Sequence, residues 1–271
     1  MILPWKLEFL LHQLRWSNYR KTSAILSSPL VYYASLIALA KNSKRVSPWT
    51  FTLKSGKEIK INHFMSSYIF NEIFVEKRYD EAFGLIKTDF PKILDIGANT
   101  GLFVLRVKSL FPLANVVAYE PERRNIEHLQ ALIQENELDH VKLHKEAIGN
   151  TDGLATLHYN DKNIGGHSVV KSFGTNQAQT VPIKHIHKLL EEHLVFDLVK
   201  IDVEGAEFEI LMALEPRHVP QLPLIIFETE LPMFRKKRLF AHLISLGYHL
   251  RPSKKVYIAE IIKKTVLQKW W

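Results

Sequence analysis

The segment from Ile93 to Gly101, Ile-Leu-Asp-Ile-Gly-Ala-Asn-Thr-Gly, constrains the fold of this chain more than any other. Its apolar start predicts a buried strand with Asp95 at its tip, followed by a turn at Gly97 and a helix that begins at Gly101. Such a strand–turn–helix brings backbone N–H groups and a helix N-terminus up to a ligand. Tight turns in other α/β proteins have similar sequences, so the segment alone leaves the ligand open.

The acid and the glycines of this turn indicate which ligand it binds. A dinucleotide fingerprint has the pattern G-x-G-x-x-G, whereas here the two glycines are four residues apart and Asp95 stands two residues before the first. A carboxylate at the strand tip repels a pyrophosphate and attracts a cation. S-adenosylmethionine (SAM) carries an ammonium and a sulfonium, so the turn favours SAM over NAD.

A second predicted strand, Asn115–Tyr119, also ends in an acid, Glu120, which lies 19 residues after Gly101. An acid at this spacing accepts hydrogen bonds from a ribose diol, although a strand end or a helix cap also explains Glu120. The following strand leads into Glu146 and Ala147, which we expect beside the adenine. A surface charge explains Glu146 equally well.

A third apolar strand, Phe196–Val203, contains Asp202 and is followed by Glu204, a glycine and a predicted helix. A strand of a parallel sheet delivers such acids to the edge of the cleft. We therefore predict that Asp202 and Glu204 are catalytic and that Asp202 also contacts the cofactor. Glu207 and Glu209 fall in the first turn of the helix, where acids complement the helix dipole.

These three segments together resemble the FkbM-type SAM-dependent methyltransferases. The matching motifs are Asp-Ile-Gly-Ala-Asn-Thr-Gly at 95–101, Tyr-Glu-Pro at 119–121 and Lys-Ile-Asp-Val-Glu-Gly-Ala-Glu at 200–207. The resemblance covers about residues 49–230. It implies a class I, Rossmann-like methyltransferase fold and methyl transfer to a hydroxyl oxygen, often of a sugar or another small metabolite.

The resemblance also assigns site residues by position. They are the cofactor-loop residues Asp95, Gly97 and Gly101, the ribose acid Glu120, and the late signature Asp202, Glu204 and Glu207. We add Asn99, from the same loop, to the predicted cofactor-binding residues.

Alternating strands and helical stretches from residue 92 to 230 predict a doubly wound, mostly parallel α/β sheet. We expect an N-terminal helical extension at residues 1–48 and the methyltransferase domain at 49–271, with a hairpin at its start and a SAM-binding core at about 91–230. The chain has no cysteine. This excludes disulfides, cysteine-ligated zinc and the thiolate nucleophile of cytosine-C5 methyltransferases.

Charge is distributed unevenly along the chain. Residues 1–90 hold 13 basic and 7 acidic side chains, residues 91–230 hold 13 and 20, and residues 231–271 hold 10 and 1. The acidic middle suits a cation-binding cleft. The basic ends suit an anionic membrane surface or an acidic glycan, although a solvated basic face is an equal explanation. Aromatic residues for base stacking are missing around Arg235, which disfavours RNA.

Thr22–Ala40 is a stretch of 19 residues without a charge, close to the minimum for a membrane-spanning helix. Its four serines and Pro29 make its hydrophobicity marginal. We expect helices docked on the catalytic domain, with interfacial membrane attachment as the alternative. A SAM enzyme is expected in the cytosol, with or without peripheral membrane contact. The oligomeric state is not predicted.

Methyl transfer to a sugar hydroxyl needs a base, because the hydroxyl is barely acidic. Asp202 is the first candidate, followed by Glu204, Glu228 and His167; His167 lies in a glycine-containing loop of the insertion at residues 151–183. A solvated side chain is the alternative for His167. The acids at the strand tips also suit Mg²⁺, but the second Asp-Asn pair of metal-dependent O-methyltransferases is missing, so we predict no metal.

Other functions remain as alternatives. A nucleic-acid N-methyltransferase carries an Asn/Asp-Pro-Pro-aromatic motif where this chain has Asp202-Val-Glu-Gly. A NAD-dependent oxidoreductase is disfavoured by the missing third glycine and by Asp95. A non-catalytic SAM-binding protein is the remaining alternative.

Overall fold

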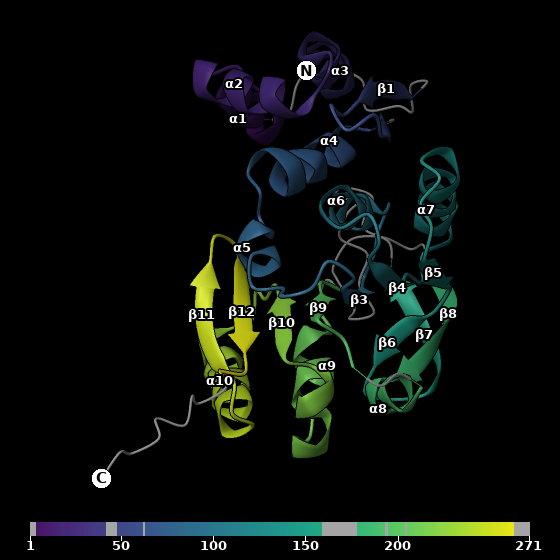
Figure 1. The fold of residues 1–271 in the computed structure, drawn as a ribbon, viewed down its shortest axis with the longest axis vertical. Coiled ribbons are helices and arrows are strands. Elements are labelled where there is room, and N and C mark those ends of the chain that lie inside the picture. Colours follow the sequence, from purple (N-terminus) through teal and green to yellow (C-terminus); the bar gives the residue numbers. More distant parts are fainter. Residues whose placement is uncertain are drawn as a thin grey trace.

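A seven-stranded, mostly parallel sheet forms the centre of the molecule, with helices on both sides (Figure 1). The computed structural model describes residues 4–41, 48–61, 63–158, 178–192, 195–203 and 205–262. In spatial order the strands are β11 (His249–Ser253), β12 (Val256–Glu260), β10 (Leu224–Phe227), β9 (Leu198–Ile201), β3 (Lys92–Ile96), β4 (Asn115–Tyr119) and β5 (Val141–His144). Only β12 runs antiparallel to its two neighbours, β10 and β11; the other pairings in this sheet are parallel.

Alternate residues of each central strand face two different hydrophobic cores. On β3, Ile93 packs in one core with Val104, while Leu94 packs in the other with Ile210. The helices of the first core include α5 (Asp80–Phe83), α6 (Leu102–Leu110) and α7 (Arg123–Glu135); those of the second are α8 (Ile186–Glu191), α9 (Glu207–Met212) and α10 (Met233–Ser245). Burial of both faces explains the continuous apolar runs in these strands. The predicted doubly wound α/β fold is confirmed.

The N-terminal extension packs into the first core. It comprises α1 (Pro4–Gln13), α2 (Trp16–Ile25) and α3 (Pro29–Lys41). The hairpin β1 (Trp49–Thr52) and β2 (Glu58–Ile61), α4 (Phe64–Phe70) and the π-helix η1 (Asn71–Val75) follow it in the chain. Tyr32, Leu36 and Leu39 of α3 are fully buried in the first core. The uncharged stretch forms two helices that break before Pro29. Within the described ranges, none of the helices has the length and hydropathy to cross a bilayer.

The insertion contributes two of the strands of a second, three-stranded sheet. Its order is β6 (Ala147–Gly149), β8 (Ala178–His185) and β7 (Gly153–His158), with β7 and β8 antiparallel as expected for a hairpin. The short 3₁₀ helix η2 (Pro216–Gln221) precedes β10, and its Val219 packs against the second core. The loop that contains His167 lies outside the described residues.

Gly97 and Gly101 are required by packing within the protein. Gly97 has φ +84°, and a Cβ there would lie 1.9 Å from the carbonyl oxygen of Asp202. Gly101 has φ +89°, and its Cβ would lie 2.4 Å from Leu129 Cδ1 on α7. Both glycines therefore leave room for other parts of the protein, Gly97 for the end of β9 and Gly101 for α7.

Replacing Gly97 with alanine is expected to destabilise the protein far more than the same change at Gly56. Gly56 has φ +88°, but nothing lies within 4 Å of a Cβ built on it. Gly56→Ala therefore costs only the left-handed strain, about 1–2 kcal/mol of unfolding free energy, whereas Gly97→Ala adds a backbone collision. Denaturant unfolding of both variants measures the difference. Equal losses would show that the close approach of β3 and β9 is not needed.

Candidate active site

A buried ion pair lies beneath the glycine turn. Asp95 and Lys200 are register partners on β3 and β9, and the Lys200 Nζ lies 2.9 Å from Asp95 Oδ1. The same ammonium donates to the carbonyl of Gly97 at 2.8 Å. Burial raises the pKa of Asp95, and Lys200 opposes that shift. Burial lowers the pKa of Lys200, but the neighbouring carboxylates outweigh it and raise the net value. With two acceptors on Lys200, we treat the pair as ionised at neutral pH.

This pairing changes the role expected for Asp95. Its side chain is fully buried and lines neither of the two cavities at the site. One carboxylate oxygen contacts Lys200, and the other has no hydrogen-bond partner. Asp95 therefore stabilises the turn through Lys200, which also binds the Gly97 carbonyl. It has no exposed surface with which to contact the cofactor cation. Gly101 likewise lies behind the lining, where it packs on α7.

Glu120 secures the other side of the turn. Its Oε2 accepts the backbone N–H of Asn99 at 2.7 Å, and its Oε1 accepts the N–H of Glu122 at 2.9 Å and Asn125 Nδ2 at 3.3 Å. Burial raises the pKa of Glu120 to about 7, against the opposing effect of these three donors. A carboxylate has about four acceptor positions. Glu120 therefore has room for about one further hydrogen bond, and for a second if it releases Asn125.

Most of the predicted cofactor residues lie together around a narrow slot beside Glu120. The lining includes predicted residues from the ends of β3, β4 and β9 and from the start of β6: Gly97, Asn99, Glu120, Glu146, Ala147 and Asp202. Glu146 also forms an ion pair with Lys184 at 3.1 Å. The slot therefore combines one free carboxylate position at Glu120 with an apolar wall that includes Ile148 and Leu157.

A larger cavity of about 1100 Å³ adjoins the slot. Gly97, Asn99 and Asp202 line both spaces, so the two meet at these residues. The far wall comes from the N-terminal extension, through Trp5 and Phe9 among others. The extension thus takes part in forming the site, which the sequence did not reveal.

Asp202 lies at the junction with a partly exposed carboxylate. The Tyr79 hydroxyl donates to its Oδ2 at 3.4 Å, and Lys200 Nζ lies 3.8 Å away. The loop after it is fastened by Glu207, whose carboxylate accepts the N–H groups of Val203 and Gly205, both at 2.9 Å. Glu207 therefore does more than complement the helix dipole. The predicted catalytic residue Glu204 lies outside the described residues, as does His167.

Arg78 joins two further acids at the cavity. It donates to Glu228 at 2.7 Å and to Glu72 at 3.1 Å, and Lys255 approaches Glu72 at 2.6 Å. Burial raises the pKa of Glu228 to about 7, with a further contribution from Asp202 and an opposing one from Arg78. Glu228 can thus exchange a proton near neutral pH.

Sequence reasoning gave no role to Lys200, Arg78 or Tyr79. Lys200 did carry a signal, because a lysine within the apolar run Phe196–Val203 must find a partner when the strand is buried. Arg78 and Tyr79 lie outside the three motifs, and the folded structure brings them to the wall of the cavity.

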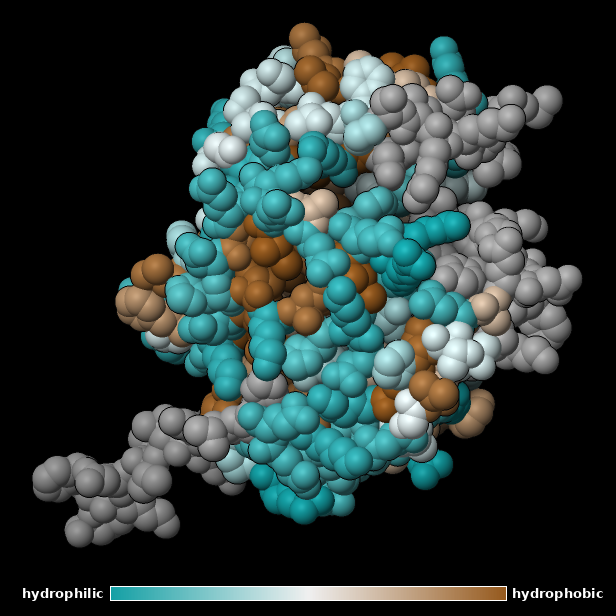
Figure 2. Space-filling view, turned by 90° about the vertical axis from the view of Figure 1, so that its right-hand side faces the viewer, coloured by the Kyte–Doolittle hydropathy of each residue, from teal (hydrophilic) through white to brown (hydrophobic). Residues whose placement is uncertain are grey.

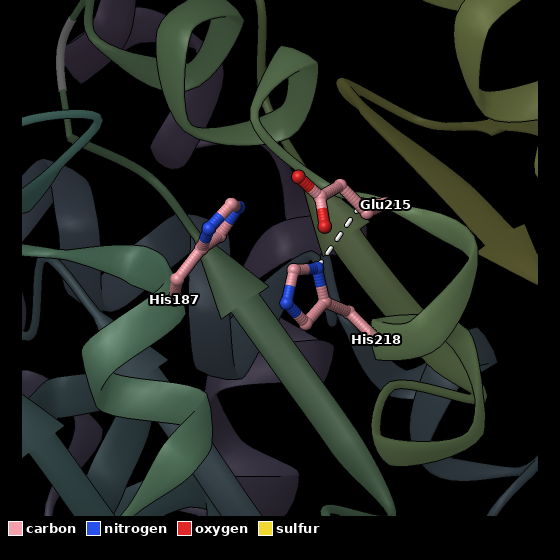
Figure 3. A group of neighbouring side chains, drawn as sticks. All are labelled: His187, Glu215 and His218. Atoms are coloured by element: carbon pink, nitrogen blue, oxygen red, sulfur yellow. Dashed lines mark hydrogen bonds between the residues drawn. The ribbon is translucent and has the colours of Figure 1, made fainter.

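A separate group consists of His187 on α8, Glu215 just before η2 and His218 on η2 (Figure 3). The side-chain nitrogen and oxygen atoms that could ligate a metal ion lie within 4.8 Å of one another. His218 Nδ1 accepts the Glu215 N–H at 3.0 Å, so its neutral ring carries the proton on Nε2. His187 Nε2 lies 2.5 Å from the Ala213 carbonyl, and Arg217 pairs with Glu215. We assign this group to joining α8 and η2.

A family model described as "Methyltransferase FkbM domain" matches residues 95–250, more than half of the chain. The chain belongs to the FkbM methyltransferase family. Enzymes of this family and fold generally take their methyl group from SAM.

Relatives of this FkbM protein include other methyltransferases. "Methyltransferase 1" of Beauveria bassiana is 28% identical over 185 residues, which span 59% of this chain and 72% of that protein. "Methyltransferase sdnD" of Sordaria araneosa is 27% identical over 223 residues, 70% of this chain and 85% of that protein. Among solved structures, the FkbM methyltransferase from Methylobacillus flagellatus has a TM-score of 0.48 at 15% identity, over 72% of this chain and 53% of its own.

Proposed function

We propose that this protein transfers a methyl group from SAM to a hydroxyl oxygen of a glycan or another hydroxylated small metabolite. The observation that carries the proposal is that Gly97, Asn99 and Asp202 line both the slot and the larger cavity. A donor in the slot and an acceptor in the cavity would meet at this junction. Methyl transfer from a sulfonium is an in-line displacement, for which alignment and exclusion of water are the main requirements.

The slot suits the adenosine half of SAM. Glu120 retains acceptor capacity for a ribose hydroxyl, and the wall at Glu146 and Ala147 would lie along the adenine. SAM, when bound, supplies an electrophilic methyl group on a sulfonium. With Asp95 buried, Asp202 is the predicted acid that faces this cation.

Asp202 is also our candidate for the base. As the C–O bond forms, its carboxylate would take the hydroxyl proton, while Tyr79 and Lys200 hold it in place. Glu228, held by Arg78, is a second group that can accept that proton. Glu204 and His167 keep the catalytic roles predicted from the sequence.

The cavity wall favours a ring-containing acceptor. Six aromatic side chains line it, namely Trp5, Phe9, Tyr68, Tyr79, Phe103 and Tyr257. Flat aromatic faces pack on the apolar face of a sugar or on another ring, while the acids around Asp202 bind hydroxyl groups. We place this reaction in the cytosol, where SAM is made.

The first expected outcome is that S-adenosylhomocysteine binds, NAD does not, and affinity rises with pH. Glu120 titrates near 7 in the free protein, and a ribose hydroxyl donates better to its ionised form. The dissociation constant should therefore fall as pH rises from below 7 to above 7. Glu120→Gln should weaken binding by about 1–3 kcal/mol and remove the pH dependence. Isothermal titration calorimetry across this pH range measures both.

A matched control is Glu127→Gln, which neutralises an exposed acid on α7 that pairs with Arg123. It should leave the affinity and its pH dependence unchanged. Heat from NAD but none from S-adenosylhomocysteine would refute the proposed donor. An identical pH profile in Glu120→Gln would refute the role of Glu120.

The second expected outcome concerns Asp202. Asp202→Asn keeps the shape of the side chain but removes the base, so methyl transfer should fall by about 100-fold or more. The unfolding free energy of Asp202→Asn should stay close to that of the native protein, so that the loss of rate is not a loss of folded protein. The assay follows the labelled methyl of SAM into a panel of glycans and hydroxylated metabolites, with the exposed Asp89→Asn as control. Label in a base-stable methyl ether is predicted. Full turnover by Asp202→Asn, or label on nitrogen, would contradict the proposal.

A further inference from the structure

Helix α1 exposes an apolar stripe on the side that faces away from the core. Leu7 and Leu11 of α1 and Leu14, the residue after its end, follow one another at spacings of four and three residues and are 46%, 60% and 56% exposed. Leu10 and Gln13, on another side of the helix, are buried. Residues at these spacings share one face of a helix. The stripe is therefore a continuous apolar surface directed at solvent.

Helix α3, which packs on α1, carries a second stripe of the same kind. Leu30 is 71% exposed, Ala34 is exposed and Ile37 is 41% exposed, while Tyr32 and Leu36 on the other side are buried. A soluble monomer rarely leaves such contiguous apolar surface open, and a patch rimmed by polar residues marks an interaction site. The two stripes belong to the helical cap at one end of the molecule (Figure 1).

The same segment, α1 to α3, also carries exposed basic side chains. Arg15, Arg20, Lys21 and Lys41 are all exposed. Residues 4–41 hold five basic side chains against one acidic one, Glu8. Trp16, the first residue of α2, is 72% exposed, and tryptophan suits the boundary between water and lipid. In Figure 2, apolar side chains reach the surface at this end of the molecule.

We propose that the α1–α3 cap is a docking surface for an anionic lipid membrane. The leucine stripes would enter the boundary of the acyl chains while the arginines and lysines meet the lipid headgroups. A second copy of this chain is the poorer occupant, because a self-complementary contact would bring two basic surfaces together. Binding is interfacial, since no described helix is long and apolar enough to span a bilayer.

Docking through this cap would place the acceptor cavity near the membrane. Trp5 and Phe9, on a third side of α1, line that cavity. Membrane binding itself does not depend on methyl transfer, so it is tested without any acceptor.

The experiment is flotation of the full-length protein with vesicles of phosphatidylcholine alone and of phosphatidylcholine mixed equally with phosphatidylserine. We expect binding to the anionic vesicles and weaker binding at high salt. Leu7→Ser/Leu11→Ser/Leu14→Ser should reduce the bound fraction at least about tenfold, because the inserted apolar surface is lost. Arg15→Ser/Arg20→Ser/Lys21→Ser should reduce binding to a similar extent and leave a salt-insensitive remainder.

Two matched controls alter equally exposed residues elsewhere. Phe90→Ser/Leu154→Ser removes apolar surface from outside the cap, and Lys237→Ser/Arg238→Ser removes charge from α10. Both should bind like the native chain. Circular dichroism and S-adenosylhomocysteine binding check that each variant is folded. No binding by the native protein, or equal losses in controls and cap variants, would overturn the proposal. So would a concentration-dependent dimer that the leucine substitutions abolish.

Discussion

The ion pair between Asp95 and Lys200 is the interaction on which the rest of the site depends. It joins neighbouring strands at their carboxyl ends, and a second contact of Lys200, to the Gly97 carbonyl, extends it into the turn. The ends of β3 and β9 approach so closely that Gly97 has no space for a Cβ. Glu120 then fixes the turn from the β4 side through the Asn99 N–H. Three segments distant in sequence thus become one rigid unit.

This unit determines where chemistry can occur. The backbone N–H of Asp202 bonds to the carbonyl of Ile96 at 3.0 Å, so the β3–β9 contact also sets the position of the Asp202 carboxylate. That carboxylate lies where the slot and the cavity meet. The helical cap closes the cavity from the other side with Trp5 and Phe9. A donor and an acceptor would therefore be aligned by elements that are packed before either binds.

Much of the fold and part of the site could be predicted, because buried parallel strands leave continuous apolar runs and their ends leave acids and glycines. Glu120, Asn99 and Asp202 were predicted in this way, and all three line the slot. The burial of Asp95 was not, because its partner lies 105 residues further along the chain and no local pattern connects them. Gly97 and Gly101 were predicted at the turn from the sequence. Their close contacts with the end of β9 and with α7 were not, because those segments are distant in the chain. The contribution of α1 to the cavity depends on tertiary packing, which leaves no short motif.

Unfolding and S-adenosylhomocysteine binding of Lys200→Met test the central claim most directly. Removing one partner of a buried pair leaves Asp95 uncompensated, so unfolding free energy should fall by about 3–5 kcal/mol. The loss should grow as pH rises, since burial raises the pKa of Asp95 and its charged form is the costly one. Asp95→Asn/Lys200→Met should recover part of that stability, and the single variant should bind S-adenosylhomocysteine more weakly. A single variant with native stability and affinity would contradict the account.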